Sequence, residues 1–144
     1  MAGILYDSSI FIDSFRRDDY SLLLSRNVDV DGKMLPVYFS AVVLSELLAG
    51  ARDAQPRKFL AKVERQYQTL RRLVVPTKND WSISGQILLK IGEKHGFEQI
   101  KRSRMTNDCL IAMSARRLGL TVVTTNIRDF QMISEFRPFE FLEV

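Results

Sequence analysis

The chain has 144 residues, and 46% of them are hydrophobic, which is typical of one folded domain and excludes a disordered segment. It contains no apolar run of the roughly 18 residues that a membrane-spanning helix needs, and its N-terminus lacks the basic start of a signal peptide. The lone Cys109 excludes an internal disulfide and fits a reducing cytoplasm. We therefore expect a single cytoplasmic domain over residues 1–144, with no membrane partner.

The net charge of +4 is concentrated in one part of the chain. Between Arg52 and Arg72, seven basic residues stand against two acidic ones, so this stretch carries +5 and the remainder carries −1. Local positive charge attracts polyanions such as RNA. An ordinary solvated helix face has the same composition, so both interpretations stay open.

Hydrophobic spacing and turn residues predict alternating strands and helices. In chain order, we expect a strand over 3–7, a helix after it, a turn over 29–33, a strand over 37–39, a helix over 41–49, a basic helix including 59–70, a strand over 73–75, a helix from about 80 to 96, a loop over 97–105, a helix over 107–118, and strands over 120–124 and 139–142. This alternation indicates an α/β fold, with a mostly parallel central sheet of about five strands and helices on both faces.

Capping residues set the predicted helix boundaries. The expected N-caps are Ser8 or Ser9 for the first helix, Ser40 for the helix over 41–49, Asn79 or Asp80 for the helix after the third strand, and Thr106 for the helix over 107–118. The expected stops are Gly50, Gly96 and Gly119.

Four acidic residues lie at the edges of these elements, far apart in sequence: Asp7, Glu46, Asp108 and Asp129. Each alone has an ordinary interpretation, such as a helix cap or a surface residue. Ligands of parallel sheets gather outside the carboxyl ends of the strands, where these residues are able to converge. Two like charges 4 Å apart repel by roughly 4 kcal/mol at an effective dielectric of 20. A divalent cation held by oxygen ligands is the simplest remedy for such a cluster.

Four segments together resemble a known family: Ile4–Ser9, Ser40–Gly50, Asn107–Ala112 and Thr124–Phe130. Their order and spacing are similar to those of PIN domains, and particularly of the toxins in VapBC-type (type II) toxin–antitoxin pairs. The resemblance spans nearly the whole chain. It implies a PIN-like fold, Mg²⁺ or Mn²⁺ as cofactor, and endoribonuclease activity selective for single strands. It also implies a homodimer and inhibition by a small antitoxin protein.

Two positions depart from the family pattern. Ser9 stands where many relatives carry Asn, two residues after the first acid. At the fourth acidic position the chain has both Asn126 and Asp129, and relatives place the acid at either. We favour Asp129 as the acid, with Asn126 as a neutral neighbour.

The reaction that these residues suggest is hydrolysis of an RNA phosphodiester by a metal-activated water. Asp7 and Asp108 are expected to hold the principal ion and Asp129 to complete its oxygen shell. Glu46 is expected to bind a second ion or to orient the attacking water. The expected supporting hydrogen-bond groups are Ser9, Thr106, Thr125 and Asn126. The candidates for contacts with RNA phosphates are Lys101, Arg102 and Arg104.

The alternative function is a catalytically silent PIN-fold module that binds RNA or protein. Metal-dependent cleavage distinguishes the two. Several apolar residues are expected either in the core or in an antitoxin groove: Phe11, Phe15, Leu47, Leu48 and Leu60. Trp81 is expected in the core or at an interface.

Overall fold

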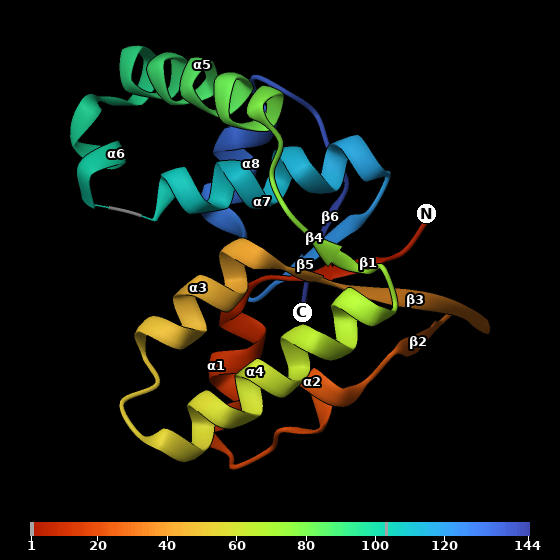
Figure 1. Cartoon of the computed structure of the whole chain (residues 1–144). Coiled ribbons are helices and arrows are strands. Elements are labelled where there is room, and N and C mark those ends of the chain that lie inside the picture. Colours follow the sequence, from red (N-terminus) through yellow and green to blue (C-terminus); the bar gives the residue numbers. More distant parts are fainter. Residues whose placement is uncertain (1, 103) are drawn as a thin grey trace.

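The computed structural model describes the backbone of residues 2–102 and 104–144, and excludes the side chains of residues 99, 101 and 102 (Figure 1). The strands are β1 (Ile4–Tyr6), β2 (Asn27–Val30), β3 (Lys33–Ser40), β4 (Leu73–Val74), β5 (Thr121–Thr124) and β6 (Phe141–Glu143). The helices are α1 (Ser8–Arg16), α2 (Ser21–Leu24), α3 (Ala41–Ala49), α4 (Ala54–Thr69), α5 (Lys78–His95), α6 (Phe97–Arg102), α7 (Met105–Leu118) and α8 (Ile127–Ser134).

The sheet confirms the predicted α/β architecture. Its strands run in the order β2-β3-β1-β5-β6, and β4 pairs with the end of β3. All pairings are parallel except that of β2 with β3, which form a hairpin. The central strand β1 is entirely buried, as expected of a parallel strand covered on both faces.

The helices form two layers around this sheet, as Figure 1 shows. Helices α1, α3 and α4 lie below the sheet in this view, whereas α5, α7 and α8 lie above it. The lower layer packs on an aromatic group in which Phe39 stacks on Tyr67 at 5.3 Å and meets Phe11 edge-on at 5.8 Å. Among the described residues, no helix combines the length and the apolar composition that crossing a membrane requires.

The helix boundaries follow local capping chemistry. The Ser40 hydroxyl accepts hydrogen bonds from the amides of Val42 and Val43, which confirms the predicted start of α3. At the end of α7, Gly119 adopts a left-handed conformation with φ of +69°. This conformation is easy for glycine, so the predicted stop is confirmed.

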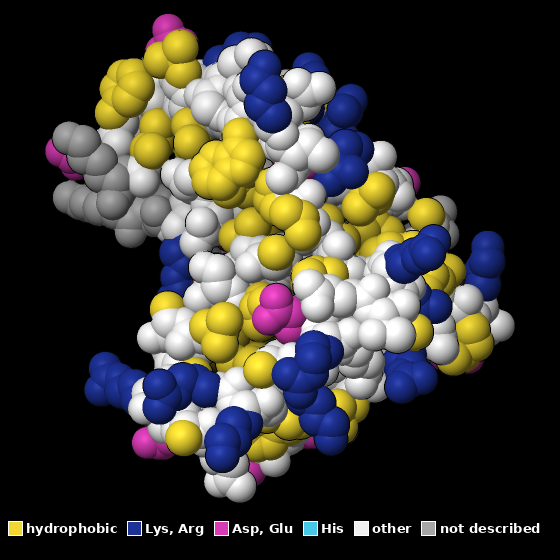
Figure 2. All heavy atoms as spheres, in the orientation of Figure 1, with side chains coloured by type: hydrophobic (Ala, Val, Ile, Leu, Met, Phe, Trp, Pro, Cys, Tyr) yellow, Lys and Arg dark blue, Asp and Glu magenta, His cyan; other side chains and the backbone are white. Residues whose placement is uncertain are grey.

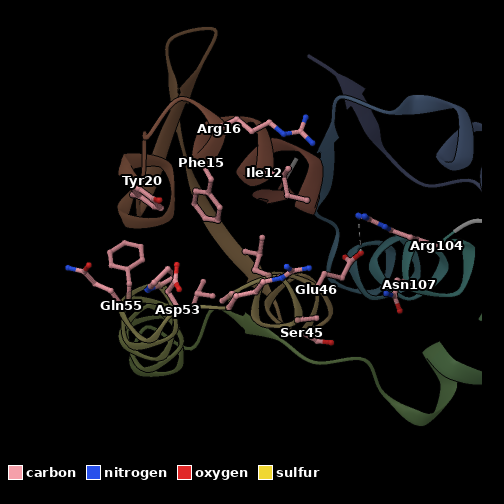
Figure 3. Close-up of a pocket in the computed structure, with 18 residues that line it drawn as sticks. Ile12, Phe15, Arg16, Tyr20, Ser45, Glu46, Asp53, Gln55, Arg104 and Asn107 are labelled. Atoms are coloured by element: carbon pink, nitrogen blue, oxygen red, sulfur yellow. Dashed lines mark ion pairs between the residues drawn. The ribbon is translucent and has the colours of Figure 1, made fainter.

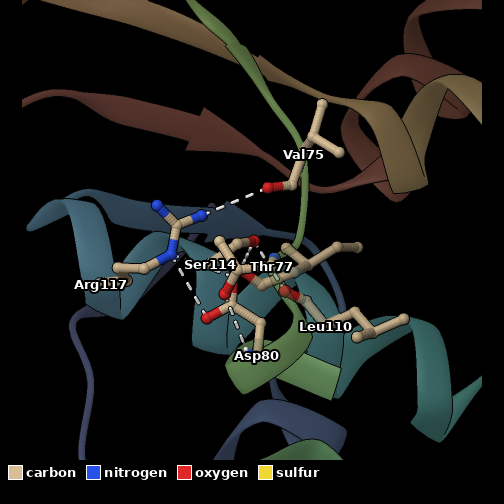
Figure 4. Close-up of polar contacts among 7 residues, drawn as sticks. Val75, Thr77, Asp80, Leu110, Ser114 and Arg117 are labelled. Atoms are coloured by element: carbon tan, nitrogen blue, oxygen red, sulfur yellow. Dashed lines mark hydrogen bonds and ion pairs between the residues drawn. The ribbon is translucent and has the colours of Figure 1, made fainter. Parts of the chain in front are cut away.

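A capping box starts α5, and here the prediction of Asn79 or Asp80 as N-cap is wrong. The Thr77 hydroxyl accepts from the Asp80 amide at 3.2 Å, and Asp80 Oδ2 accepts from the Thr77 amide at 2.9 Å. The Asp80 carboxylate also accepts from Arg117 Nε at 3.1 Å, as Figure 4 shows. Asp80 therefore joins the start of α5 to the end of α7.

Other parts of the chain also differ from the prediction. Residues 97–102 form helix α6, although we expected a loop there because the stretch follows Gly96. The stretch itself contains no glycine or proline, so it is able to form a helix. The hairpin strand β2 and the helices α2 and α8 were not predicted. The first helix is capped by Asp7 and not by Ser8 or Ser9.

Candidate active site

Asp7 lies at the carboxyl end of β1 and is held there by three hydrogen bonds. Its Oδ1 accepts from the Ser8 amide at 2.8 Å, which makes it the N-cap of α1. Its Oδ2 accepts from the hydroxyls of Thr124 at 2.9 Å and Ser9 at 3.1 Å. The carboxylate is buried, so these donors replace the water that it has lost. Ser9 thus contacts the first acid in the way the sequence suggested.

Hydroxyl groups also tie the loop after β5 to the end of β1. The Ser9 hydroxyl accepts from the Thr125 amide at 3.2 Å, and the Thr124 hydroxyl accepts from the Asn126 amide at 3.0 Å. The side chains of Thr125 and Asn126 themselves are exposed. Sequence reasoning missed Thr124, whose place beside Asp7 depends on the pairing of β1 with β5.

Asp108 is buried in the first turn of α7. The pKa of this carboxyl is raised to about 9, first by burial and then by the charges of Asp7, Asp129 and Glu46 in that order. A charged carboxylate shifts the pKa of another group in this way only when the two groups are close together. The fold therefore brings together the four acids that the sequence singled out.

Glu46 lies in the second turn of α3. Burial and the charge of Asp7 raise the pKa of this carboxyl, and Arg104 opposes them. Its Oε2 lies 3.7 Å from Arg104 Nη1, and Figure 3 shows the two side chains directed toward each other. Its Oε1 is buried and has no hydrogen-bond partner among the described residues. An unpartnered buried carboxylate oxygen is suited to bind a cation.

Asp129 lies in the first turn of α8, next to the acid cluster. Its carboxylate raises the pKa of Asp108 and also that of the Cys109 thiol. Burial is the main reason that the pKa of Cys109 reaches about 12. The thiol is therefore protonated at neutral pH, as expected of a small buried residue.

The donor set fits a hard divalent cation, because it consists of carboxylate oxygens. Burial of Asp108 beside like charges and the unpartnered oxygen of Glu46 both favour a positive charge between them. Among the described residues, no three acidic, histidine or cysteine side chains have the geometry of a formed metal site. The chemistry of the cluster suits the ion, and the ligand geometry is not preformed.

The family model of the PIN domain matches residues 4–135. This chain belongs to the PIN domain family. No curated protein matches the sequence.

Solved structures share the fold over nearly the full chain. DNA-bound VapBC from Salmonella typhimurium is 23% identical with a TM-score of 0.63, and the match covers 99% of this chain and 98% of that one. FitAcB from Neisseria gonorrhoeae is 21% identical with a TM-score of 0.63, covering 97% and 96%. VapBC-5 from Mycobacterium tuberculosis is 20% identical with a TM-score of 0.59, covering 100% of both chains. At these identities the similarity establishes the PIN-like fold.

A groove of about 1290 Å³ leads away from Glu46 and Arg104 in this PIN domain (Figure 3). It runs between α1, α3 and α4, and its apolar lining includes Ile12, Phe15, Leu47, Phe59 and Leu60. Three of the five apolar residues considered for an antitoxin groove thus line it. Of the other two, Phe11 is buried in the core and Leu48 is exposed outside the groove.

The remaining candidate residues lie in α6 and at the start of α7. Arg104 is 66% exposed at the start of α7 and contacts Glu46. Lys101 and Arg102 are in α6, and their side chains lie outside the described part of the chain. Thr106 is exposed in the first turn of α7, so the prediction of Thr106 as the N-cap is wrong; the N-cap is Arg104. Asn107, which sequence reasoning missed, lines the groove and lowers the pKa of Glu46 slightly.

Proposed function

We propose that this PIN domain is a metal-dependent endoribonuclease and the toxin of a type II toxin–antitoxin pair. PIN domains are generally nucleases, and the match of this family to residues 4–135 supports such an activity. The observation that carries the proposal is the meeting of four carboxylates from four separate elements. Burial, together with the charges of the other three acids, raises the pKa of Asp108 to about 9. Such a cluster costs free energy unless a cation meets it, so its presence indicates a function.

Asp7 and Asp108 are the proposed ligands of the principal Mg²⁺ or Mn²⁺, and Asp129 contributes further oxygen atoms. Glu46 is proposed to orient the attacking water or to hold a second ion. When bound, the metal lowers the pKa of water and offsets the negative charge of the phosphodiester. Ser9 and Thr124 donate hydrogen bonds to Asp7 and so keep its carboxylate in one orientation.

The proposed RNA contacts begin at Arg104. Its exposed guanidinium is beside the acid cluster, and a planar guanidinium suits phosphate oxygens. Lys101 and Arg102 follow on α6, which is adjacent to α7. Together they offer positive charge to a single-stranded RNA that approaches the acids.

The test is cleavage of structured and single-stranded RNAs by purified protein with Mg²⁺, with Mn²⁺ and with EDTA. Asp7→Asn is compared with Asp31→Asn, which changes a carboxylate in an exposed turn with φ of +52°, a conformation that Asn accepts. We expect metal-dependent cleavage that only the Asp7 variant loses. A folded protein that cleaves no RNA with either metal supports the alternative, a catalytically silent module.

We also propose that a small antitoxin protein binds in the groove between α1, α3 and α4. Two of the similar structures are VapBC proteins, and one belongs to a family of toxin–antitoxin systems. An apolar groove that ends at Glu46 suits the apolar face of a partner helix. A partner there covers the acids and blocks the substrate. Phe15→Ala is expected to weaken inhibition by the antitoxin while cleavage continues.

Three further expectations accompany the proposal. Action on RNA, together with the single cysteine, favours the cytoplasm as the place of function. A homodimer is the expected assembly. The organisation of residues 1–144 as one domain stays a prediction.

A further inference from the structure

Helix α4 carries a basic stripe on its solvent side, formed by Lys58, Lys62 and Arg65, which are all exposed. Each is two residues from a buried residue of the same helix, Leu60 or Val63. Two residues of an α-helix turn a side chain through about 200°, so the stripe lies opposite the core. Figure 2 shows Lys and Arg side chains over the lower part of the visible face, where α4 lies in Figure 1.

The charge of the basic stripe is not balanced within the protein. None of its three residues forms an ion pair in the part of the chain that the structure describes. The acid of α4, Glu64, is not three or four residues from any of them, which is the spacing at which helical side chains meet. Lys58 and Lys62 are themselves four residues apart, and like charges at this spacing destabilise a helix. An ordinary solvated helix face mixes both signs, so the stripe indicates a negatively charged partner.

The spacing of the stripe suits a nucleic-acid strand. Lys58 and Lys62 are about 6 Å apart along the helix axis, and Arg65 is about 4.5 Å further on. A stacked strand carries one phosphate about every 3.4 Å, so cations in a row of this length are able to meet several phosphates of one strand. The backbone of a nucleic acid is therefore a partner of matching charge and matching repeat.

Positive charge continues past the end of α4. Arg72 Nη1 donates a hydrogen bond to the Arg26 carbonyl at 2.7 Å, which joins the turn after α4 to the segment before β2. The pKa of Tyr67 is raised to about 12, mainly by burial, and the charges of Arg72 and Arg26 oppose this rise. Both guanidinium groups thus lie near the last turn of α4, and the positive surface extends beyond the helix itself.

The groove connects the stripe with the acid cluster. Glu46 and Arg104 line this groove, and so do the exposed Arg16 and Arg52. Helix α4 forms one wall of it through residues such as Phe59. A strand held at the acids therefore has basic side chains beside it along the groove as far as α4. An antitoxin in the groove blocks the same path.

An exposed aromatic side chain borders the stripe and favours single strands. Tyr20 is 40% exposed and meets Phe59 of α4 edge-on at 5.8 Å. Phe59 is three residues before Lys62, so the two are neighbours on the helix surface. An unpaired base is free to stack on an aromatic ring, whereas the bases of a duplex already stack on each other. Basic side chains beside an aromatic ring are thus typical of single-strand binding.

We propose that Lys58, Lys62 and Arg65 hold the sugar–phosphate backbone of a single-stranded RNA outside the acid cluster, with Tyr20 stacked on an unpaired base. The three are positioning residues, because they act on the strand and not on the reacting phosphate. This inference rests on the proposed function for the identity of the strand as the substrate. Binding is measurable without cleavage, so the two proposals can fail separately.

The experiment measures binding of a labelled single-stranded RNA by fluorescence anisotropy in EDTA, with the full Asp7→Asn chain so that no strand is cut. The strand has about 20 nucleotides, more than the usual site size of a single-strand-binding fold. The double variant Lys58→Gln, Lys62→Gln is expected to bind about tenfold more weakly at low salt, because two phosphate contacts are lost. The slope of log K against log salt is expected to fall by about 1.4, or about 0.7 for each contact. Gln and Lys have similar helix propensities, so the fold is retained.

The matched control is Lys78→Gln, Lys90→Gln on α5, which removes the same charge from exposed positions in the opposite helix layer. Helix α5 also exposes an aromatic side chain, since Trp81 is 56% exposed and is therefore not in the core. The control is expected to bind RNA as the unchanged chain does. Equal losses in both double variants, or a loss in neither, contradict the proposal.

Two further ligands separate single-stranded RNA from other anions. Duplex RNA of the same length and phosphatidylglycerol vesicles are expected to bind more weakly than the single strand, because neither offers an unpaired base to Tyr20. If either binds as tightly and loses as much affinity in the α4 variant, the stripe is a general anion surface and its assignment to single-stranded RNA is wrong.

Cleavage by the chain with Asp7 intact gives a second measurement. The RNA is lengthened on each side in turn by six nucleotides, which span about 20 Å in a stacked strand. One of the two extensions is expected to lower KM, and Lys58→Gln, Lys62→Gln is expected to abolish this gain while kcat stays the same. A lower kcat in the variant contradicts a role confined to holding the strand. If the chain cuts no RNA at all, the proposed function fails, and the binding measurements still decide whether the stripe holds RNA.

Discussion

Two buried carboxylates on adjacent helices, Asp80 and Asp108, have opposite surroundings. Asp80 accepts hydrogen bonds from the Thr77 amide and from Arg117, and the positive charge of Arg117 balances its negative charge. Asp108 lies among three other acids, and its pKa is raised to about 9. A buried carboxylate that is paired with a cation fixes the packing of two helices. A cluster of buried carboxylates without such a cation is unfavourable until a positively charged ligand binds. Burial alone therefore does not indicate a functional acid; the lack of a matching cation does.

The largest expected effect is the loss of cleavage in Asp7→Asn. The amide keeps the shape of the side chain and removes the charge that the cluster offers to a metal. We expect cleavage to fall to background while the circular dichroism spectrum stays unchanged. Asp80→Asn, at the other kind of buried site, is expected to keep its cleavage activity. If Asp7→Asn and Asp80→Asn both fold and lose cleavage equally, the distinction between a functional and a structural buried acid is wrong.

Next in size is the effect of Thr124→Val, which keeps the volume of the side chain and removes its hydrogen bond to Asp7. Groups that orient metal ligands contribute roughly 10- to 100-fold in metal affinity or activity. We expect the Mg²⁺ concentration for half-maximal cleavage to rise within this range. The matched control is Thr121→Val at the other end of the same strand. The Thr121 hydroxyl donates a hydrogen bond to Glu140 and none to Asp7. A similar rise in both variants points to a general effect on β5.

Arg117→Met tests the compensated site. It leaves the Asp80 carboxylate buried without its cation, and because Arg117 is partly exposed we expect a loss of about 2 kcal/mol in the free energy of unfolding. For a chain of this length that corresponds to a drop of roughly 4–8 °C in Tm. Arg116→Met, one residue earlier and outside this pair, is the control. An unchanged Tm in the Arg117 variant shows that the ion pair between Arg117 and Asp80 contributes nothing measurable to stability.

The smallest expected effect has the opposite sign: Asp108→Asn stabilises the metal-free protein. The folded protein binds the Asp108 proton more tightly than the unfolded chain, so its stability falls as pH rises from the unfolded pKa of 3.8 toward about 9. We expect the variant to gain about 1 kcal/mol, or roughly 2–4 °C in Tm, at pH 8 in EDTA.

Thermal unfolding of the wild type and the variant at pH 5 and pH 8 measures this difference. The gain is expected to shrink at pH 5, because this pH is close to the unfolded pKa of 3.8 and little free energy is then needed to keep the proton on the folded carboxyl. Added Mg²⁺ is expected to raise the Tm of the wild type and not that of the variant. A variant that is less stable than the wild type at pH 8 contradicts the view that the Asp108 carboxyl destabilises the metal-free protein.

Local chemistry decided much of the structure, and the sequence predicted those parts. Ser40 caps α3 and Gly119 ends α7, because a hydroxyl and a left-handed glycine act on the nearest backbone groups. The acids Asp7, Glu46, Asp108 and Asp129 were recognised because each lies at the edge of a predicted apolar element, and such edges converge at the carboxyl ends of parallel strands. The predictions failed where two local choices compete, as between Thr77 and Asp80 at the start of α5 or between loop and helix over residues 97–102.

The tertiary structure alone decided which of the recognised groups meet. The hydrogen bond from Thr124 to Asp7 joins residues that are 117 positions apart, and it depends on the register of β1 with β5. The contact of Arg117 with Asp80 depends on how α5 packs against α7. Pattern and capping signals reach only a few residues along the chain, whereas the charge around a buried acid is set by whichever distant segments pack beside it. The sequence thus determined the fold class and the acids, and packing determined which acid is neutralised by a cation and which lies among like charges.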